Sequence, residues 1–211
     1  DTDGVEHDQY LTNLSWSPDG KTILLAIVNR AQNHYDVVAF SAKNGKRGET
    51  LLSVSNDKWA EPEHAAYWVN NKEFVWMTER DGYMNLYLYN TKGELVRQLT
   101  DNDFVATGIL GQDKSGDLLF NATGDDPRES HLFSVSLKGK QIQLTQAAGY
   151  HSPTVQEGGH YFIDSYSSVD VPAKDVLMTT GGEEARTLAE AADPFEGTNI
   201  RKPEMGNITG P

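Results

Sequence analysis

Short apolar and aromatic runs separated by polar breakers occupy most of the chain. The clearest example is residues 64–100, where four runs rich in Trp, Tyr, Phe, Val and Leu are separated by Asn70-Asn71-Lys72, Asp81-Gly82 and Lys92-Gly93. Runs of this length between turn-forming residues predict four antiparallel strands joined by tight turns. Four strands in so short a segment make one small sheet, which cannot bury both of its faces by itself.

The same unit is repeated four times along the chain. Its first hairpin turns at Asp19-Gly20, Asn70-Asn71, Ser115-Gly116 and Gly158-Gly159, and its last tight turn falls at Asn44-Gly45, Lys92-Gly93, Lys138-Gly139 and Gly181-Gly182. The strand after each last turn reaches a leucine at Leu52, Leu99, Leu144 and Leu188. The last turns and the leucines recur every 43 to 48 residues, a spacing typical of the four-stranded blade of a β-propeller. We therefore predict an all-β fold made of four propeller blades.

The blade boundaries follow from this repeat. It places the blades at residues 10–54, 64–100, 105–145 and 152–190, after a lead-in at residues 1–9. Residues 191–211 are rich in Pro, Gly and Asn, so we interpret them as a linker that leaves the domain. Glu183 to Ala192 contains good helix formers, but the repeat predicts a strand over Ala185–Leu188, and we follow the repeat. Trp16, near the end of the first strand, is predicted to belong to the core.

Composition and charge narrow the range of functions. The 211 residues are 37% hydrophobic and carry a formal net charge of −13, whereas a nucleic-acid-binding surface needs clustered Lys and Arg. The chain contains no cysteine and so has no disulfide and no thiolate chemistry, which fits the bacterial cytosol or periplasm. Its longest apolar run, Ile23 to Val28, is far shorter than the roughly 20 residues that cross a bilayer. We therefore expect no nucleic-acid partner and no membrane span.

The motifs that mark enzyme active sites are missing from the sequence. It has no G-x-S-x-G turn for an activated serine, no H-E-x-x-H metal motif and no glycine-rich phosphate or dinucleotide loop. A metal site would need ligands from several blades, because the histidines are scattered among different units: His7, His34, His64, His131, His151 and His160. We predict no catalytic residue, no metal ligand and no cofactor within this chain.

The connector at residues 55–63 combines an aromatic residue with carboxylates. Trp59 stands next to Glu61, Pro62 and Glu63, and connecting loops are where binding residues concentrate. Two interpretations stay open. Trp59 and Glu61 either face a ligand, or Trp59 caps the edge of its blade while the glutamates face water.

Three stretches in register closely resemble the later blades of the amino-terminal propeller of dipeptidyl peptidase IV and its bacterial relatives. They are NRAQNHYDVVAF from Asn29, KWAEPEHAAYWV from Lys58 and ERDGYMNLYLYNTKGELVRQLT from Glu79. The similarity continues into NIRKPEMGNIT at residues 199–209, which looks like the junction to the family's α/β-hydrolase domain. The chain is accordingly identified as the later half of this propeller in a bacterial member of the family, and the resemblance implies a periplasmic or secreted protein.

The resemblance implies a parent serine peptidase that removes dipeptides from peptide amino termini, with Pro or Ala at the second position. Its propeller would roof and gate the cavity of its own hydrolase domain, which supplies a Ser-Asp-His triad. In the family that triad lies after the region matched here, and the glutamate pair that binds the substrate ammonium group lies before it. Neither is carried over to a residue of this chain, which should be inactive alone. The connector matches a position from which the family reaches the cavity, so Trp59 and Glu61 would belong to the substrate-cavity wall.

Propellers of this family have eight blades, and four are present here. An open half-ring leaves the outer faces of its first and last blades uncovered, so we expect self-association through these faces. Four blades that close on themselves are the alternative. Two other functions stay open. One is a stand-alone periplasmic propeller scaffold that binds protein partners. The other is a carbohydrate-binding or carbohydrate-hydrolysing propeller, which would need aromatic platforms and paired carboxylates on one rim, where the sequence offers only Trp59 with its neighbouring glutamates.

Overall fold

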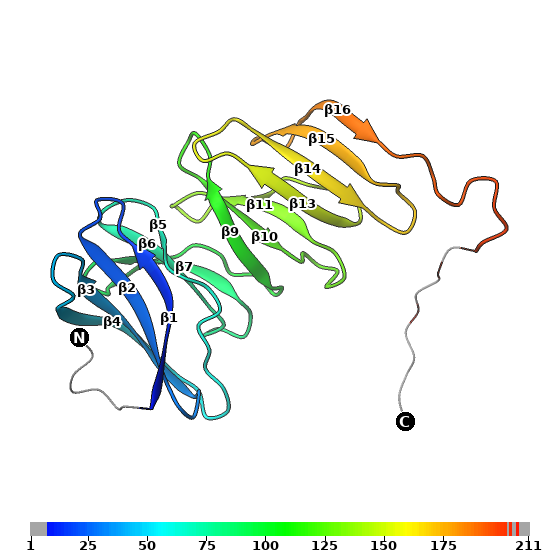
Figure 1. Cartoon of the computed structure of the whole chain (residues 1–211). Coiled ribbons are helices and arrows are strands. Elements are labelled where there is room, and N and C mark those ends of the chain that lie inside the picture. Colours follow the sequence, from blue (N-terminus) through cyan, green and yellow to red (C-terminus); the bar gives the residue numbers. More distant parts are fainter. Residues whose placement is uncertain (1–7, 202, 204–205, 207–211) are drawn as a thin grey trace, which may run out of the picture.

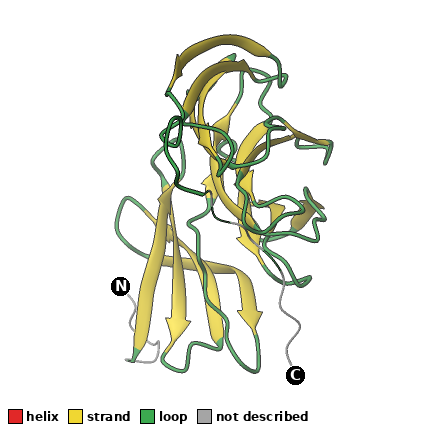
Figure 2. Cartoon of the chain, turned by 90° about the vertical axis from the view of Figure 1, so that its right-hand side faces the viewer, coloured by secondary structure: helices red, strands yellow, loops and turns green. Residues whose placement is uncertain are grey.

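The structure is a computed structural model that describes residues 8–201, 203 and 206. In this part of the chain the regular elements are sixteen β-strands, arranged as four sheets of four antiparallel strands. The sheets follow one another in chain order in an open row, with β1 to β4 at one end and β13 to β16 at the other (Figure 1). Figure 2 shows strands and connecting loops and no helix in the described residues. The predicted all-β fold of four-stranded blades is confirmed.

Each blade is a meander in which consecutive strands are hydrogen-bonded neighbours. Blade 1 contains β1 (Gln9–Trp16), β2 (Thr22–Asn29), β3 (His34–Ser41) and β4 (Arg47–Ser55), and blade 2 contains β5 (Tyr67–Trp68), β6 (Glu73–Thr78), β7 (Asn85–Asn90) and β8 (Leu95–Gln98). Blade 3 contains β9 (Ala106–Gln112), β10 (Leu118–Ala122), β11 (His131–Val135) and β12 (Gln141–Gln143), and blade 4 contains β13 (Tyr150–Val155), β14 (Tyr161–Ser167), β15 (Lys174–Thr179) and β16 (Glu184–Glu190).

Alternation along the middle strands divides the side chains between the two faces of a blade. In β6, Phe74 and Trp76 belong to the core shared with blade 1, while Val75 and Met77 belong to the core shared with blade 3. All four side chains are buried, and burying an apolar side chain of this size contributes about 1.5–3 kcal/mol. Blade 2 is therefore covered on both faces by its neighbours.

The junctions between consecutive blades differ in how apolar they are. Among the described residues, the clusters between blades 1 and 2 and between blades 2 and 3 each contain twelve buried apolar residues, whereas the cluster between blades 3 and 4 contains four. At the first junction the rings of Tyr35 and Trp76 lie 6.1 Å apart, and the Trp76 indole N–H donates to the Tyr35 hydroxyl at 3.3 Å. The third junction instead contains His131, His151 and Asp164, which are all buried.

A carboxylate also links three blades where their first strands approach one another. Glu157, in the turn between β13 and β14, accepts a hydrogen bond from the hydroxyl of Tyr67 in β5 at 3.1 Å and from the backbone N–H of Gln112 in β9 at 3.2 Å. Burial, with the neighbouring charge of Glu157, raises the pKa of the Tyr67 hydroxyl. This carboxylate therefore ties blade 4 to blades 2 and 3.

The predictions for β16 and for Trp16, at the two ends of the row of blades, have different outcomes. β16 is a strand, as the repeat predicted, because pairing with β15 from Lys174↔Glu190 to Met178↔Glu184 overrides its helix propensity. The prediction that Trp16 belongs to the core is wrong, since this side chain is 54% exposed. Trp16 is paired with Ile23 across β1 and β2, so both lie on the face of blade 1 that points away from blade 2.

Candidate functional site

The connector between blades 1 and 2 brings Trp59 and Glu61 together at the rim of the blades. The indole N–H of Trp59 donates to the Glu61 carboxylate at 3.0 Å, and the Trp59 side chain remains 52% exposed. Both residues line a cleft of about 250 Å³. The pair therefore presents an open aromatic face whose orientation is held by a neighbouring carboxylate.

Four hydrogen bonds fix the path of this connector. The side-chain oxygen of Asn56 accepts from the backbone N–H groups of Lys58 at 2.9 Å and Trp59 at 3.3 Å, which makes a local turn. The backbone N–H of Ala60 donates to the carbonyl of Gln32, in the β2–β3 turn, at 2.9 Å. The Asn13 amide, from a bulge in β1 where φ is +56°, donates to the Pro62 carbonyl at 2.9 Å. Trp59 is thus held from both sides by blade 1.

Two buried and three exposed residues complete the lining of the cleft. Tyr35 of β3 and Thr78 of β6 lie at its base, and Glu63, Glu79 and Arg80 line its sides. Burial raises the pKa of the Tyr35 hydroxyl, which stays protonated near neutral pH. The cleft is therefore lined by carboxylates on two sides and by one guanidinium.

Arg80 is held in place by two aromatic residues of β7. Its guanidinium donates to the hydroxyl of Tyr89 at 3.2 Å and lies 5.4 Å from the centre of the Tyr87 ring. Burial raises the pKa of the Tyr87 hydroxyl, and its hydrogen bond to Asp81, at 2.5 Å, acts in the same direction. A fixed cation beside Glu79 and Glu61 suits the recognition of a polar ligand that carries both signs of charge.

One group of side chains near the cleft has the composition of a catalytic triad. The ring of His34 lies 2.7 Å from the Ser55 hydroxyl through Nδ1 and 3.3 Å from Asp36 through Nε2. The His34–Ser55 contact is a cross-strand pair between β3 and β4, whereas His34 and Asp36 lie two residues apart on β3, where Asp36 faces Ser53. They lie on a solvent-exposed sheet surface, whereas acyl transfer needs a desolvated oxyanion site next to the nucleophile. We assign no catalytic residue here.

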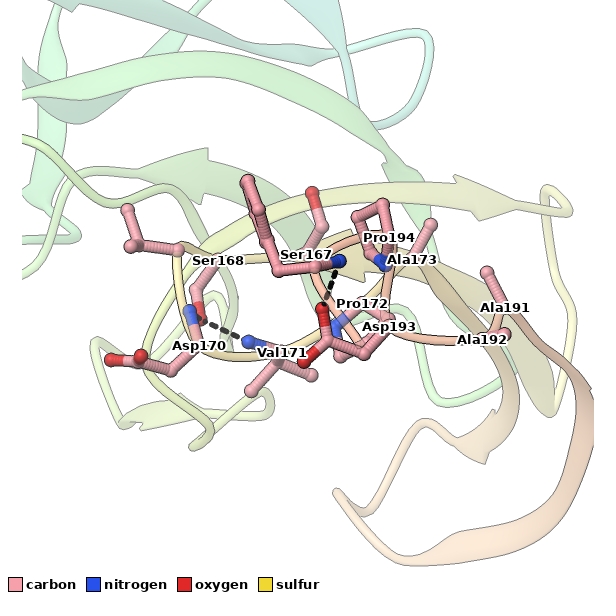
Figure 3. Close-up of a pocket in the computed structure, with 12 residues that line it drawn as sticks. Ser167, Ser168, Asp170, Val171, Pro172, Ala173, Ala191, Ala192, Asp193 and Pro194 are labelled. Carbon is pink, nitrogen blue, oxygen red and sulfur yellow. Dashed lines mark hydrogen bonds between the residues drawn. The ribbon is translucent and has the colours of Figure 1, made fainter. Parts of the chain in front are cut away.

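A second cavity, of about 350 Å³, lies where the chain leaves blade 4 (Figure 3). The loop between β14 and β15 forms one wall, and the segment after β16, from Ala191 to Phe195, forms the other. The Ser168 hydroxyl accepts from the backbone N–H groups of Asp170 and Val171, and Asp193 accepts from that of Phe195 at 2.9 Å. These side chains cap local turns on both walls of the cavity. The capped turns fix the path of the chain where the predicted linker begins.

Two further observations concern ligands and membranes. Within the described residues, no three His, Asp or Glu side chains gather in a way that could hold a metal ion. None of these residues belongs to a helix that could span a bilayer.

Residues 1–173 match the family model described as the dipeptidyl peptidase IV (DPP IV) N-terminal region. The chain belongs to the DPP IV family. This match covers most of the chain and includes the connector that carries Trp59 and Glu61.

Relatives and solved structures agree with the family assignment. The chain is 25% identical to a probable dipeptidyl peptidase 4 of Aspergillus flavus over 96% of its length, and 27% identical to the Aspergillus fumigatus counterpart over 90%. A putative dipeptidyl aminopeptidase IV from Bacteroides ovatus superimposes with a TM-score of 0.84 at 29% identity, covering 93% of this chain and 31% of that one. Porphyromonas gingivalis dipeptidyl peptidase 4 has the same fold, with a TM-score of 0.79 at 22% identity over 89% of this chain and 27% of that one.

The chain spans about a quarter of the length of the curated relatives it matches, since it covers 28% and 26% of the two Aspergillus proteins. The sequence predicted that Trp59 and Glu61 belong to the wall of a substrate cavity, which stays a prediction, and the structure places both residues in one cleft. Tyr35, Glu79 and Arg80 were missed as lining residues. The sequence did contain a signal for Glu79 and Arg80, because both belong to the Glu79-Arg80-Asp81-Gly82 turn between the two middle strands of blade 2. Such turns lie at the same end of the blades as the connectors between blades.

Proposed function

We propose that this chain is the propeller portion of a serine-type dipeptidyl peptidase, and that it roofs and gates the cavity of a hydrolase domain in the same parent polypeptide. The observation that carries the proposal is the family match over residues 1–173. The parent enzyme removes dipeptides from peptide amino termini and prefers Pro or Ala at the second position. The 29% identity to the Bacteroides ovatus protein supports a bacterial origin, and a periplasmic or secreted location is part of the same proposal.

Within that role, Trp59 and Glu61 form part of the substrate-cavity wall. The exposed indole offers a flat apolar surface against which a proline ring or an alanine methyl group can pack. The Glu63 and Glu79 carboxylates favour a positively charged group at the mouth of the same cleft, and Arg80 favours a backbone carbonyl or carboxylate. The cleft thus matches a short extended peptide better than an anionic polymer.

Steady-state kinetics of the parent polypeptide with a chromogenic Ala-Pro or Gly-Pro substrate would test this role. We expect Trp59→Ala to raise KM about tenfold with little change in kcat, because the contact binds substrate and transition state alike; tenfold corresponds to about 1.4 kcal/mol. Glu61→Gln should have a smaller effect, since the amide oxygen can still accept from the indole. Glu49→Gln, an exposed position on β4, is the matched control. An unchanged KM in Trp59→Ala would contradict the assignment.

The 211-residue chain alone should not hydrolyse these substrates. A fluorophosphonate probe for activated serines gives the direct measurement, with Ser55→Ala as the control for the His34–Ser55 pair. Labelling of the chain that disappears in Ser55→Ala would overturn the proposal that catalysis resides in another part of the polypeptide.

We also propose that the isolated chain self-associates through the two ends of its open row. Leu11 and Trp16 on blade 1 and Tyr161 and Ile163 on blade 4 are exposed, and apolar patches of this kind usually mark interaction surfaces. The same surfaces would serve a stand-alone periplasmic scaffold, which is the second candidate function. A parent polypeptide with peptidase activity would argue against the scaffold.

A further inference from the structure

Two buried histidines meet at the junction between blades 3 and 4. The rings of His131, at the start of β11, and His151, in β13, have centres 5.0 Å apart. Each ring has a carboxylate of its own. Nε2 of His131 lies 2.9 Å from Glu129, and Nδ1 of His151 lies 2.7 Å from Asp164. Two imidazoles this close repel each other when both are charged, so the protonation state of one depends on that of the other.

The partners of His151 require the charged ring. Besides Asp164 at Nδ1, the carbonyl oxygen of Ala147 lies 2.7 Å from Nε2. Both partners are acceptors, and a neutral imidazole carries a single N–H, so only the imidazolium form donates to both. The second oxygen of Asp164 is buried without a hydrogen-bond partner among the described residues. The charge of this carboxylate is therefore compensated mainly by His151.

The partners of His131 fit the neutral ring instead. The hydroxyl oxygen of Thr145 lies 3.3 Å from Nδ1 and also accepts from the backbone N–H of Leu132 at 3.0 Å. The hydroxyl proton of Thr145 can then be donated to Nδ1, while the N–H at Nε2 donates to Glu129. A second proton, at Nδ1, would leave the hydroxyl proton of Thr145 without an acceptor among the described residues.

The charges around the pair are mostly negative. The titratable and charged groups that face His151 are Glu129 before β11, His131 of β11, Asp164 and Tyr166 of β14, Lys174 of β15 and Glu184 of β16. Lys174 lies 3.8 Å from Glu190, so its charge is already paired, and the connector at residues 144–149 has no charged side chain. Three carboxylates thus favour one proton on the ring pair over none, and the hydrogen bonds place it on His151.

The backbone contacts of blade 4 with blade 3 lie at the two ends of β13. Ser130 is bridged to Tyr150 at its start, and Asp113 is bridged to Gly159 just beyond its other end. From the rings, a cavity of about 210 Å³ extends between the connector at residues 144–147 and strands β15 and β16. Among the described residues this junction has four buried apolar side chains, against twelve at each of the other two. Blade 4 is thus pinned at β13, with space beside its outer strands.

A change of protonation at either ring would act on this junction. If His151 loses a proton, its remaining N–H stays with the charged Asp164, and the lone pair at Nε2 then faces the carbonyl oxygen of Ala147, which lines the cavity. If His131 gains a proton, two cations lie 5.0 Å apart. The first change releases the connector, and the second drives the two rings apart.

We propose that the junction between blades 3 and 4 is a proton-controlled hinge, closed while His151 carries the additional proton and His131 does not. Outside that state blade 4 turns about β13 and the cavity widens. In the parent polypeptide the gating by the propeller would then depend on pH, a consequence that rests on the proposed function. The hinge itself belongs to this chain and is tested without peptidase activity.

Long-range ¹H–¹⁵N NMR spectra of the histidine rings test the proton assignment. Near neutral pH we expect two N–H groups on His151 and one, at Nε2, on His131. The same spectra, recorded over a pH series, give the midpoint at which each ring titrates. A charged His131 beside a neutral His151, or two rings of equal charge, would overturn the proposal.

Distances between two spin labels test the hinge. The sequence has no cysteine, so Ile142→Cys on β12 and Ala185→Cys on β16, both exposed, place the labels across the junction. Pulsed electron double resonance of the dilute full chain should give a single distance between the two ring midpoints. A longer distance should appear above the His151 midpoint and below the His131 midpoint. The control pair, Leu95→Cys on β8 with Ile142→Cys, spans the apolar junction between blades 2 and 3 and should not change.

Substitution of each ring separates the two pH responses. His151→Gln cannot be charged, so we expect the longer distance at every pH. His131→Gln should keep the alkaline change and lose the acidic one. His160→Gln, at an exposed ring in the β13–β14 turn, is the matched control and should behave as the wild type. Circular dichroism verifies folding, and if His151→Gln does not fold, the wild type and His131→Gln still decide the outcome.

The hinge and the proposed function can fail separately. Ring titration without any change in the label distance would overturn the hinge and leave the proposed function standing. An equal pH response of the control label pair would also overturn it, because the whole row would then be loosening. A parent polypeptide without peptidase activity would contradict the proposed function and leave the hinge intact.

Discussion

His151 meets hydrogen-bond acceptors at both nitrogens of its ring. Nδ1 lies 2.7 Å from the Asp164 carboxylate and Nε2 lies 2.7 Å from the Ala147 carbonyl, and the His151 side chain is almost completely buried. A neutral imidazole has only one N–H, so the imidazolium form alone satisfies both contacts. Burial by itself would lower the pKa of His151, but the Asp164 carboxylate and the Ala147 carbonyl raise it more, and the net pKa lies above the ordinary value.

The groups around His151 determine how this junction responds to pH. Its ring lies 5.0 Å from that of His131 and 4.7 Å from that of Tyr166. His131 contacts Glu129 at 2.9 Å, and Glu184 lines the cavity of about 210 Å³ beside Asp164. One oxygen of Asp164 is buried without a hydrogen-bond partner, so a buried charge pair at this junction is only partly compensated.

Because its pKa is raised on folding, His151 should stabilise the protein most at low pH. The contribution is fully present below the unfolded pKa of about 6.5 and is lost as pH rises through the folded pKa. We expect an NMR titration of the His151 ring to give a midpoint above 6.5, and Asp164→Asn to move it down. As pH rises from about 6.5 through the midpoint of that titration, the free energy of urea unfolding should fall more in the wild type than in Asp164→Asn. Equal pH slopes in the two proteins would contradict this role.

At the scale of the element, turns and pairing decide the structure more than intrinsic propensity. The Glu184–Glu190 segment is composed largely of helix formers, yet it is the last strand of blade 4 because it pairs with β15 along its length, with two register shifts. At the turn that contains Gly93, by contrast, the residue type agrees with the backbone conformation and with the small space around the Cβ position. Glycine is needed there both for the positive φ and for the contact with Leu51.

Two glycine-to-alanine substitutions separate the requirement for a positive φ from the requirement for space at the Cβ position. Gly20 also has positive φ, +68°, but nothing lies near its Cβ position, so Gly20→Ala should cost only the strain of a left-handed residue, about 1 kcal/mol. Gly93→Ala should destabilise the chain clearly more, because the new methyl group must push blade 2 away from blade 1. Midpoints of urea unfolding, followed by tryptophan fluorescence, give the comparison. Equal losses in the two variants would show that the Leu51 contact does not constrain the turn.

At the scale of the whole molecule, the row of blades is unevenly stabilised. Blade 2 lies between two large apolar clusters, whereas blade 4 has one small cluster on its inner side and an exposed face on the other. Local opening is governed by how many apolar contacts a segment would lose. Blade 4 is therefore the part of the row that should open most readily.

Amide hydrogen exchange of the dilute chain should show this difference directly. We expect the slowest exchange in β6 and β7 and faster exchange in β14 and β15, with the gap narrowing at protein concentrations that favour association. Protection in blade 4 equal to that in blade 2 under dilute conditions would contradict the uneven distribution of stability.

The sequence by itself determined the blades, because strand alternation and turn chemistry are local and repeat with one period. It also placed Trp59 beside Glu61, since two residues in one turn are neighbours whatever the rest of the fold does. Trp16 was misplaced because a strand pattern shows that one face is apolar and does not show whether another sheet covers it. Only the tertiary structure brought Arg80 to the Trp59 cleft and His131 to His151, because those contacts join separate blades. Their geometry depends on how the sheets pack, which no local pattern encodes.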